Sequence, residues 1–291
     1  MRITNNANLP EVFVEAVRRR ERPPGYVRPP NTYSVTDLLN PPRQVVLKRR
    51  FADQLVQDAS EMVWAAFGAG VHKMLEDVTG QDNWLRETNV ETSIKATGGM
   101  LTDATLRGRI DYYEKDAQAL WDFKTASTWA KKFGSLEGYK DQLELYAYLF
   151  EASSVRHKVK TCNILLLYKD WKHGETRDPS YPQQAVEVVT WEPTGQLSPT
   201  IQERIAAIQA AENELPECTD DETWARGECW AVYKGTNKKA SRLLDSEEQA
   251  RKWIGQQSGS GWNIVHRPPV YTRCERYCSV AQFCEQAQSR K

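Results

Sequence analysis

Two short stretches, Gly108-Arg-Ile-Asp111 and Trp121-Asp-Phe-Lys-Thr125, decide the fold that this sequence predicts. The first lies in residues 106–114 and the second in residues 119–125, and both segments are rich in β-branched and aromatic residues, which favours β-strand. The residues between them, 115–118, are polar enough to form a turn. The sequence therefore predicts a β-hairpin.

The hairpin brings charged side chains together. A turn centred between residues 116 and 117 places Asp111 opposite Asp122, and alternation along the strand puts Asp122 and Lys124 on one face, with Trp121 and Phe123 on the other. Carboxylates bind hard cations such as Mg²⁺ or Mn²⁺, which lower the pKa of a bound water and polarise a phosphoryl oxygen. A nearby ammonium stabilises developing negative charge. An ordinary surface Asp–Lys pair is the alternative.

Further motifs decide between these alternatives. A helical segment upstream reads Gly68-Ala-Gly-Val-His72-Lys-Met-Leu75-Glu76, and one downstream reads Gln142-Leu-Glu-Leu-Tyr146. With Gly108-x-x-Asp111 and Asp122-Phe-Lys124-Thr125 between them, the sequence resembles the PD-(D/E)XK nuclease superfamily, in its RecB-like branch, which includes AddB-like and CRISPR-associated-exonuclease-like proteins. The four motifs occur in the family order within residues 64–150.

The resemblance implies an α/β fold, with a mixed central sheet flanked by helices and N- and C-terminal extensions. It implies a DNA exonuclease that depends on Mg²⁺ or Mn²⁺. The implied catalytic residues are Asp111, Asp122, Lys124, Gln142 and Tyr146. The implied metal ligands are His72, Asp111, Asp122 and the backbone carbonyl of Phe123. The resemblance also implies that Gln142 and Tyr146 contact a DNA phosphate or brace the lysine. It leaves open whether Glu76 is a partner of the site or a surface residue.

The flanks, Tyr33-Ser-Val-Thr-Asp-Leu-Leu and Tyr168-Lys-Asp-Trp171 among them, resemble phage-encoded members of the branch. This implies work in phage DNA recombination, repair or degradation, in the host cytoplasm. Because no helicase P-loop is visible, a helicase, annealing protein or single-strand-binding protein would be a separate partner. Two alternatives stay open, namely a structure- or sequence-specific endonuclease and a non-catalytic DNA-binding module.

The composition agrees with a protein of the cytosol that binds DNA through local patches. The 291 residues include 39 basic and 39 acidic side chains, so the net charge by itself does not indicate a nucleic-acid partner. No run of eighteen apolar residues and no secretory signal are present. The basic residues that we expect to contact DNA are Arg43, Lys48, Arg49, Lys131 and Lys132.

Three cysteines near the C-terminus, Cys274-x3-Cys278-x5-Cys284, predict a metal site. Soft thiolates select iron–sulfur clusters or zinc, and zinc sites usually pair their ligands more tightly. The RecB-like branch has a similar triplet that closes a [4Fe-4S] cluster, so the resemblance implies one here. Zinc, or no metal, is the alternative.

A four-iron cluster needs a fourth thiolate. The branch often places it before a proline near the N-terminus, where this sequence has Asn40. Cys218 lies in a loop and is our first choice, with Cys229 second. Cys162 lies in a predicted buried strand and is expected to be a core residue.

We expect three regions, namely an N-terminal arm with short helices (1–52), a nuclease core (53–192) and a C-terminal extension carrying the cysteines (193–291). Within the core we expect the order helix, three strands, helix, strand. The first helix is predicted to run through residues 53–78 and to stop at Gly80.

Overall fold

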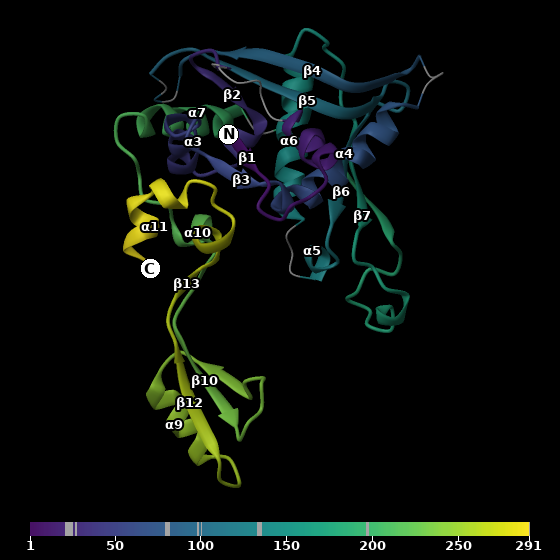
Figure 1. Ribbon diagram of the computed structural model, residues 1–291. Coiled ribbons are helices and arrows are strands. Elements are labelled where there is room, and N and C mark those ends of the chain that lie inside the picture. Colours follow the sequence, from purple (N-terminus) through teal and green to yellow (C-terminus); the bar gives the residue numbers. More distant parts are fainter. Residues whose placement is uncertain are drawn as a thin grey trace. The chain divides into compact units, whose positions relative to one another are not determined.

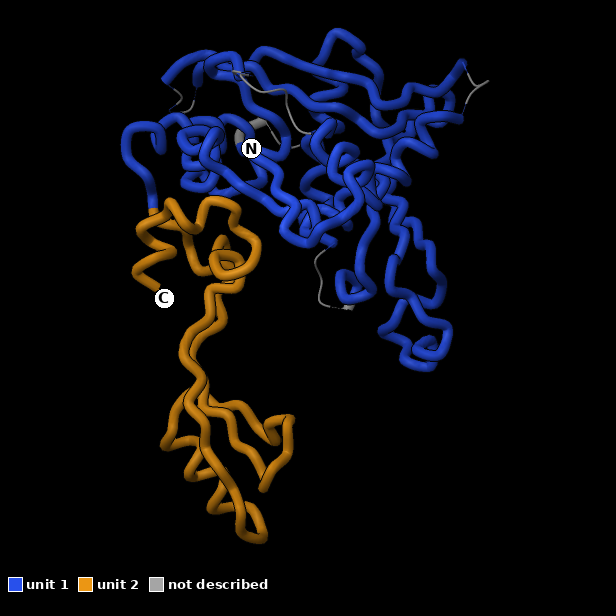
Figure 2. The backbone as a smooth tube through the Cα atoms, in the orientation of Figure 1, with its two compact units in different colours: residues 1–216 blue, residues 217–291 orange. Residues whose placement is uncertain are grey.

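The chain forms two compact units, Met1–Pro216 and Glu217–Lys291, each described by itself (Figure 2). The computed structural model describes residues 1–20, 26, 28–78, 82–97, 99, 101–132, 136–195 and 198–290. Among these residues, no helix combines the length and the apolar character needed to cross a membrane.

The first unit is built on a six-stranded mixed sheet with the order β2-β5-β6-β7-β8, in which β4 also pairs with β5 (Figure 1). The strands are β2 (Thr32–Ser34), β4 (Trp84–Ile94), β5 (Ala104–Glu114), β6 (Ala119–Ala126), β7 (Thr161–Tyr168) and β8 (Val186–Trp191). The pairs β2–β5 and β6–β7 are parallel, and the others are antiparallel. The predicted α/β fold with a mixed central sheet is confirmed.

Helices pack on this sheet, and α6 contacts four of its strands. The helices of the unit are α1 (Glu11–Arg18), α2 (Val35–Leu38), α3 (Pro42–Arg50), α4 (Val63–Glu76), α5 (Trp129–Lys132), α6 (Glu137–Ala152) and α7 (Ser198–Ala211), with single 3-10 turns at Ala59–Met62 and His173–Glu175. The order α4, β4, β5, β6, α6, β7 is the predicted one, with short α5 added. Ile201, Ile205 and Ile208 of α7 join the main core, so this helix lies within the first unit.

The predicted helix over residues 53–78 is wrong in its first part. Residues Val56–Asp58 form β3, which pairs in parallel with β1 (Arg2–Thr4), and α4 begins only at Val63. The side chain of Asp58 accepts hydrogen bonds from Thr4 and from the backbone of Asn6. These contacts come from residues more than fifty positions away, which local helix propensity does not register. Gly80 lies outside the described residues.

The hairpin of β5 and β6 has the predicted register. Tyr112 pairs with Trp121 and Glu114 with Ala119, so the next position in the same register sets Asp111 against Asp122. Since β4 pairs along the whole of β5, β2 and β6 must share the other edge of β5. They meet it at opposite ends, and the paired stretches leave residues 108–111 of β5 without a strand partner on that edge. Asp111 lies at the end of this unpaired stretch, next to the first residue that pairs with β6.

The second unit contains a small sheet and the cysteine-rich segment. Strands β10 (Cys229–Lys234), β11 (Arg242–Leu244) and β12 (Trp262–Arg267) form an antiparallel sheet in the order β11-β10-β12, against which α9 (Glu247–Gly255) packs. A two-stranded ladder, β9 (Ala225–Arg226) with β13 (Val270–Tyr271), joins this sheet to the remaining elements (Figure 1). These are α8 (Asp220–Thr223), α10 (Thr272–Arg276), a 3-10 turn at Ala281–Phe283 and α11 (Glu285–Ser289).

Candidate metal centre

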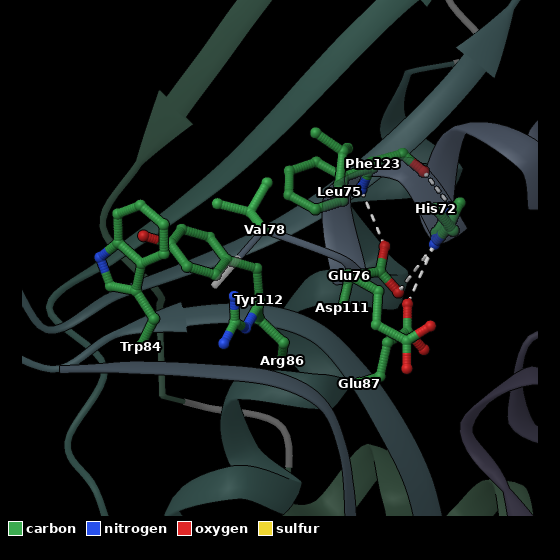
Figure 3. A pocket seen from close by; sticks show the side chains of 10 residues that line it. All are labelled: His72, Leu75, Glu76, Val78, Trp84, Arg86, Glu87, Asp111, Tyr112 and Phe123. Carbon is green, nitrogen blue, oxygen red and sulfur yellow. Dashed lines mark hydrogen bonds and ion pairs between the residues drawn. The ribbon is translucent and has the colours of Figure 1, made fainter. Parts of the chain in front are cut away.

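Three side chains from α4, β4 and β5 converge beside the hairpin. His72, Glu87 and Asp111 each offer a ligand atom, and these atoms lie within 4.8 Å of one another. Nδ1 of His72 is 3.4 Å from Oε1 of Glu87 and 3.6 Å from Oδ1 of Asp111. Two carboxylates and an imidazole, all half-buried, form a donor set that suits a divalent cation. Figure 3 shows them at one end of a pocket.

Glu87 is the member of this donor group that the sequence analysis missed. Its neighbours pair as Arg86 with Tyr112 and Thr88 with Ile110, so Glu87 lies opposite Asp111 across β4 and β5. Its φ of 44° is a left-handed conformation, rare for a residue of this type and common at functional sites. Nε of Arg109 contacts Oε2 of Glu87 at 2.8 Å and helps to hold it.

Nothing in the sequence fixes the β4–β5 register by itself, because the loop between the two strands is long. The sequence offers one signal for Glu87, an acidic residue at the start of the segment 87–94, which its pattern predicts to be the first strand of the core. Glu76, which the motif left undecided, is an exposed residue that pairs with Lys73 of the same helix at 3.3 Å and also lines the rim of the pocket.

The backbone of Phe123 links the histidine to the aspartate. Nε2 of His72 lies 3.0 Å from the carbonyl oxygen of Phe123, and the N–H of Phe123 donates to Oδ2 of Asp111 at 2.9 Å. Gly68 lets α4 approach closely enough for this, since a Cβ there would lie 3.2 Å from Oγ1 of Thr125 on β6. The expected histidine, aspartate and backbone carbonyl are therefore brought together.

Asp122 and Lys124 form a pair next to this group. Nζ of Lys124 lies 2.7 Å from Oδ1 and 2.6 Å from Oδ2 of Asp122, whose side chain is 5% exposed. Burial raises the pKa of Asp122 to about 6, Lys124 opposes the rise, and the charge of Asp111 adds to it. Burial also raises the pKa of Asp111, against the hydrogen bond from Phe123. Burial disfavours the charged forms of both carboxylates, and the positive charge beside them does not offset this effect. A bound cation would favour those charged forms.

Tyr146 and Gln142 of α6 brace β5. The Tyr146 hydroxyl hydrogen-bonds to the side chain of Gln142 and to the backbone of Arg109, in the stretch of β5 that lacks a strand partner on that edge. Burial, with the charges of Asp122 and Asp111, raises the pKa of Tyr146 to about 12. A Cβ on Gly108 would lie only 2.5 Å from Cε1 of Tyr146. The ring of Tyr146 thus occupies the space that Gly108, without a side chain, leaves free. The ring that lies under Lys124 is that of Tyr139, with Nζ 5.7 Å from the ring centroid.

Both arginines that were expected to contact DNA have partners within the fold. Arg43 is 7% exposed and donates to the carbonyl oxygens of Leu215 and Pro216 at 3.3 and 3.2 Å. Arg49 lies over the ring of Tyr33 and 3.7 Å from Oδ2 of Asp37. Both side chains connect α3 to neighbouring segments of the first unit.

The expected lysine contacts differ from one another. Lys48 is exposed on α3. Lys131 of α5 donates to both carboxylate oxygens of Glu187, at 2.7 and 2.8 Å, and the same carboxylate accepts from the hydroxyl of Tyr168. The side chain of Lys132 lies outside the described part of the structure. Lys48 and Lys131 therefore remain at or near the surface of the first unit.

The C-terminal cysteines lie close enough to influence one another. Burial raises the pKa values of Cys274 and Cys278, and the thiolates of the triplet add to both shifts. Cys284 is 7% exposed. The backbone N–H and carbonyl of Cys218 each bond to the side chain of Gln286 at 2.9 Å, which fastens Cys218 to the segment just after Cys284.

The other two cysteines have different surroundings. Cys162 is fully buried in β7, where burial raises its pKa to about 12, as expected for a core residue. Cys229 begins β10, opposite Arg267. Within the described residues, no three thiols have sulfur atoms within 4.8 Å of one another.

Comparison with known proteins identifies the class of this fold and site. A model of the PD-(D/E)XK nuclease superfamily matches residues 38–285, and the chain belongs to this superfamily. A search of curated proteins gives no significant match.

Two solved structures are similar to the chain. The crystal structure of SSO0001 shares 19% identity and a TM-score of 0.50, over 74% of this chain and 90% of that one. A phage-related exonuclease from Haemophilus somnus 129PT shares 11% identity and a TM-score of 0.28, over 70% of this chain and 81% of that one. The likeness to SSO0001, at 19% identity, concerns the fold alone.

Proposed function

We propose that this protein is a metal-dependent DNA exonuclease of the RecB-like branch that hydrolyses phosphodiester bonds. One observation carries the proposal: His72, Glu87 and Asp111 converge within 4.8 Å, directly beside the buried Asp122–Lys124 pair. Because the chain belongs to a nuclease superfamily, phosphodiester hydrolysis is the reaction that a metal held by this donor set would support. A role in phage DNA recombination, repair or degradation is part of the proposal and rests on the resemblance of the flanking sequences.

The donor set fits Mg²⁺ or Mn²⁺, because hard cations take carboxylate and carbonyl oxygens and Mn²⁺ also accepts an imidazole. His72, Glu87, Asp111 and the carbonyl of Phe123 would hold the ion, with Asp122 as a further ligand. When bound, the ion supplies Lewis acidity toward a phosphoryl oxygen and a more acidic water. Lys124 stabilises negative charge that develops on the phosphate. Gln142 and Tyr146 position β5 and thereby Asp111.

End-labelled linear duplex and closed circular duplex, incubated with Mg²⁺ or Mn²⁺, test the proposal. We expect the linear DNA to be degraded from its ends while the circle survives. Asp111→Asn, Glu87→Gln and Lys124→Met are each expected to lower the rate by on the order of 100-fold or more. Glu91→Gln, an exposed glutamate on β4, is the matched control and should cleave normally.

Other results would favour the alternatives. Cleavage of the circle would indicate an endonuclease. Binding of DNA without cleavage of either substrate, by a protein that also binds the metal, would indicate a non-catalytic module.

The same proposal includes a [4Fe-4S] cluster held by Cys218, Cys274, Cys278 and Cys284. Thiolates that share one tetrahedral zinc ion lie about 3.8 Å apart, and no three described thiols approach within 4.8 Å. A cubane, in which each thiolate binds its own iron, suits wider spacing. The bonds between Cys218 and Gln286 support Cys218 as the fourth ligand. The cluster would fasten the C-terminal segment, separately from the carboxylates.

Protein prepared without oxygen tests the cluster. We expect a brown protein with about four irons per chain. Substitution of Cys218, Cys274, Cys278 or Cys284 by alanine should bleach it, while Cys162→Ala, a core change, should not. One zinc per chain supports the zinc alternative, and the absence of both metals removes the proposed site.

A further inference from the structure

An apolar pocket opens directly beside the acidic group. It has a volume of about 240 Å³ and reaches from His72, Glu87 and Asp111 to an aromatic wall formed by Trp84, Tyr112 and others (Figure 3). Leu75 and Val78, from the C-terminal end of α4, contribute further apolar surface. Catalysis at the metal group does not by itself require such a pocket.

The aromatic wall is assembled from three neighbouring strands. Trp84 of β4 packs edge-on against Tyr112 of β5, with ring centroids 5.4 Å apart at 90°. Tyr112 stacks with Phe123 of β6, with centroids 6.2 Å apart and ring planes 19° from parallel. All three residues are half-buried, so flat ring surface remains open to a ligand. A flat, uncharged, aromatic ligand is the chemistry that such a wall favours.

The pocket also offers a hydrogen-bond donor that nothing in the fold satisfies. Nη1 of Arg86, opposite Tyr112 in the ladder, is buried and has no hydrogen-bond partner among the described residues. An unsatisfied buried donor is costly, and more so when it is charged. A ligand that brings an acceptor atom to Arg86 would remove this cost.

We propose that this pocket binds one unpaired nucleobase of the substrate strand, stacked on Trp84 and accepting a hydrogen bond from Arg86, while a phosphate next to that base lies at the metal group. The inference deepens the nuclease function proposed above and rests on it. A base is flat, aromatic and neutral, so the nearby carboxylates of Glu76 and Glu87 do not repel it. Its ring nitrogens and carbonyl oxygens are acceptors that arginine recognises.

The pocket suits an unpaired base. A cavity of about 240 Å³ has room for one base, and a base inside a duplex has both faces covered by its stacked neighbours, so it has no free face for Trp84. A paired base would first have to leave its stack, which costs a few kcal/mol in a duplex and least in a single strand or at a frayed end. The pocket therefore makes a single-stranded nucleotide beside the scissile phosphodiester the preferred substrate.

The experiment scans a single-stranded oligonucleotide with 2-aminopurine, a fluorescent base whose emission falls when it stacks on an aromatic ring. The full-length protein is mixed with the oligonucleotide in Ca²⁺, and both emission and binding are measured. A second series carries an abasic site at each position in turn. Wild type is compared with Trp84→Ala, Trp84→Phe and Arg86→Gln, and with Trp64→Ala as control, since Trp64 is 59% exposed on α4 and does not line the pocket.

We expect strong quenching at one position in the wild type, and an abasic site at that position should weaken binding about tenfold. Trp84→Ala should lose both effects, Trp84→Phe should keep the quenching because it keeps a ring, and Arg86→Gln should weaken the discrimination against the abasic site. Trp64→Ala should behave as the wild type. Thermal melting of each variant separates these effects from misfolding.

The pocket inference is overturned if no position is quenched more in the wild type than in Trp84→Ala, or if abasic sites are tolerated throughout. In that case the nuclease function still stands, provided that the wild type degrades DNA. If the wild type neither binds nor cleaves any DNA, the proposed function fails together with the inference.

Discussion

Replacing Gly108 by alanine tests whether packing against the ring of Tyr146 positions β5. The new Cβ would lie 2.5 Å from Cε1 and 3.2 Å from Cδ1 of Tyr146, and 3.2 Å from Cδ2 of Leu149. Contacts of 2.5 Å are not tolerated, and the ring cannot simply rotate away because Gln142 and the backbone of Arg109 hold its hydroxyl. Either β5 or α6 must shift.

Overpacking of this kind costs about 1–3 kcal/mol of unfolding free energy. Urea denaturation of the metal-free protein measures it, in a cycle with Tyr146→Ala and the double variant. If the ring of Tyr146 causes the destabilisation, Gly108→Ala should destabilise the Tyr146→Ala variant less than it destabilises the wild type. The coupling free energy between the two substitutions should be about 1 kcal/mol or more. Gly70→Ala is the control, because a Cβ there meets nothing within 4 Å; on a helix it should stabilise by about 0.5–1 kcal/mol.

The same shift should reach the metal site, since Asp111 follows Gly108 by three residues on the same strand. Gly108→Ala is therefore expected to weaken Mn²⁺ binding as well, measured by calorimetry. A neutral Gly108→Ala, or strictly additive effects in the cycle, would refute the view that Tyr146 positions the strand.

Further outcomes follow from the site. Glu87→Gln should weaken Mn²⁺ binding at least about tenfold in calorimetry, whereas unchanged affinity would remove Glu87 from the ligand set. Because the pKa of Asp122 is raised in the folded protein, the folded state holds its proton more tightly than the unfolded one, so metal-free stability should fall between about pH 4 and pH 6 and stay lower above it. Urea melts should show this slope, and Asp122→Asn should flatten it; an unchanged slope would contradict the burial argument. DNA binding should weaken steeply with salt, and Lys48→Ala should reduce that dependence in titrations at several salt concentrations; equal affinity at low and moderate salt would argue against a nucleic-acid ligand.

Local patterns in the sequence were enough to predict the hairpin and its neighbours. The turn at residues 115–118 fixes the pairing of Tyr112 with Trp121, and from it follows the meeting of Asp111 and Asp122. The order of the core elements follows equally from alternation, length and capping. Outside the core, the Ser-x-x-Asp pattern at residues 34–37 is typical of a helix start, and Ser34 does cap α2 by accepting a hydrogen bond from the backbone N–H of Asp37.

What local patterns could not predict depends on pairing between distant segments. Glu87 joins the donor group only because β4 pairs with β5 in one particular register and because its own backbone is left-handed. The stretch before α4 forms a strand and a turn, because β3 pairs with β1 at the N-terminus of the chain. Arg43 reads as a basic surface residue in the sequence, but it is buried and bonds to carbonyls more than 170 positions away.

The four motifs form one packing unit, because their elements contact one another at defined positions. Two motif glycines lie where one motif element approaches another: Gly68 of α4 meets Thr125 of β6, and Gly108 of β5 meets Tyr146 of α6. Phe123, inside the third motif, then bonds through its backbone to side chains of the first and second motifs. A substitution that adds bulk at either glycine should therefore impair metal binding without touching a ligand.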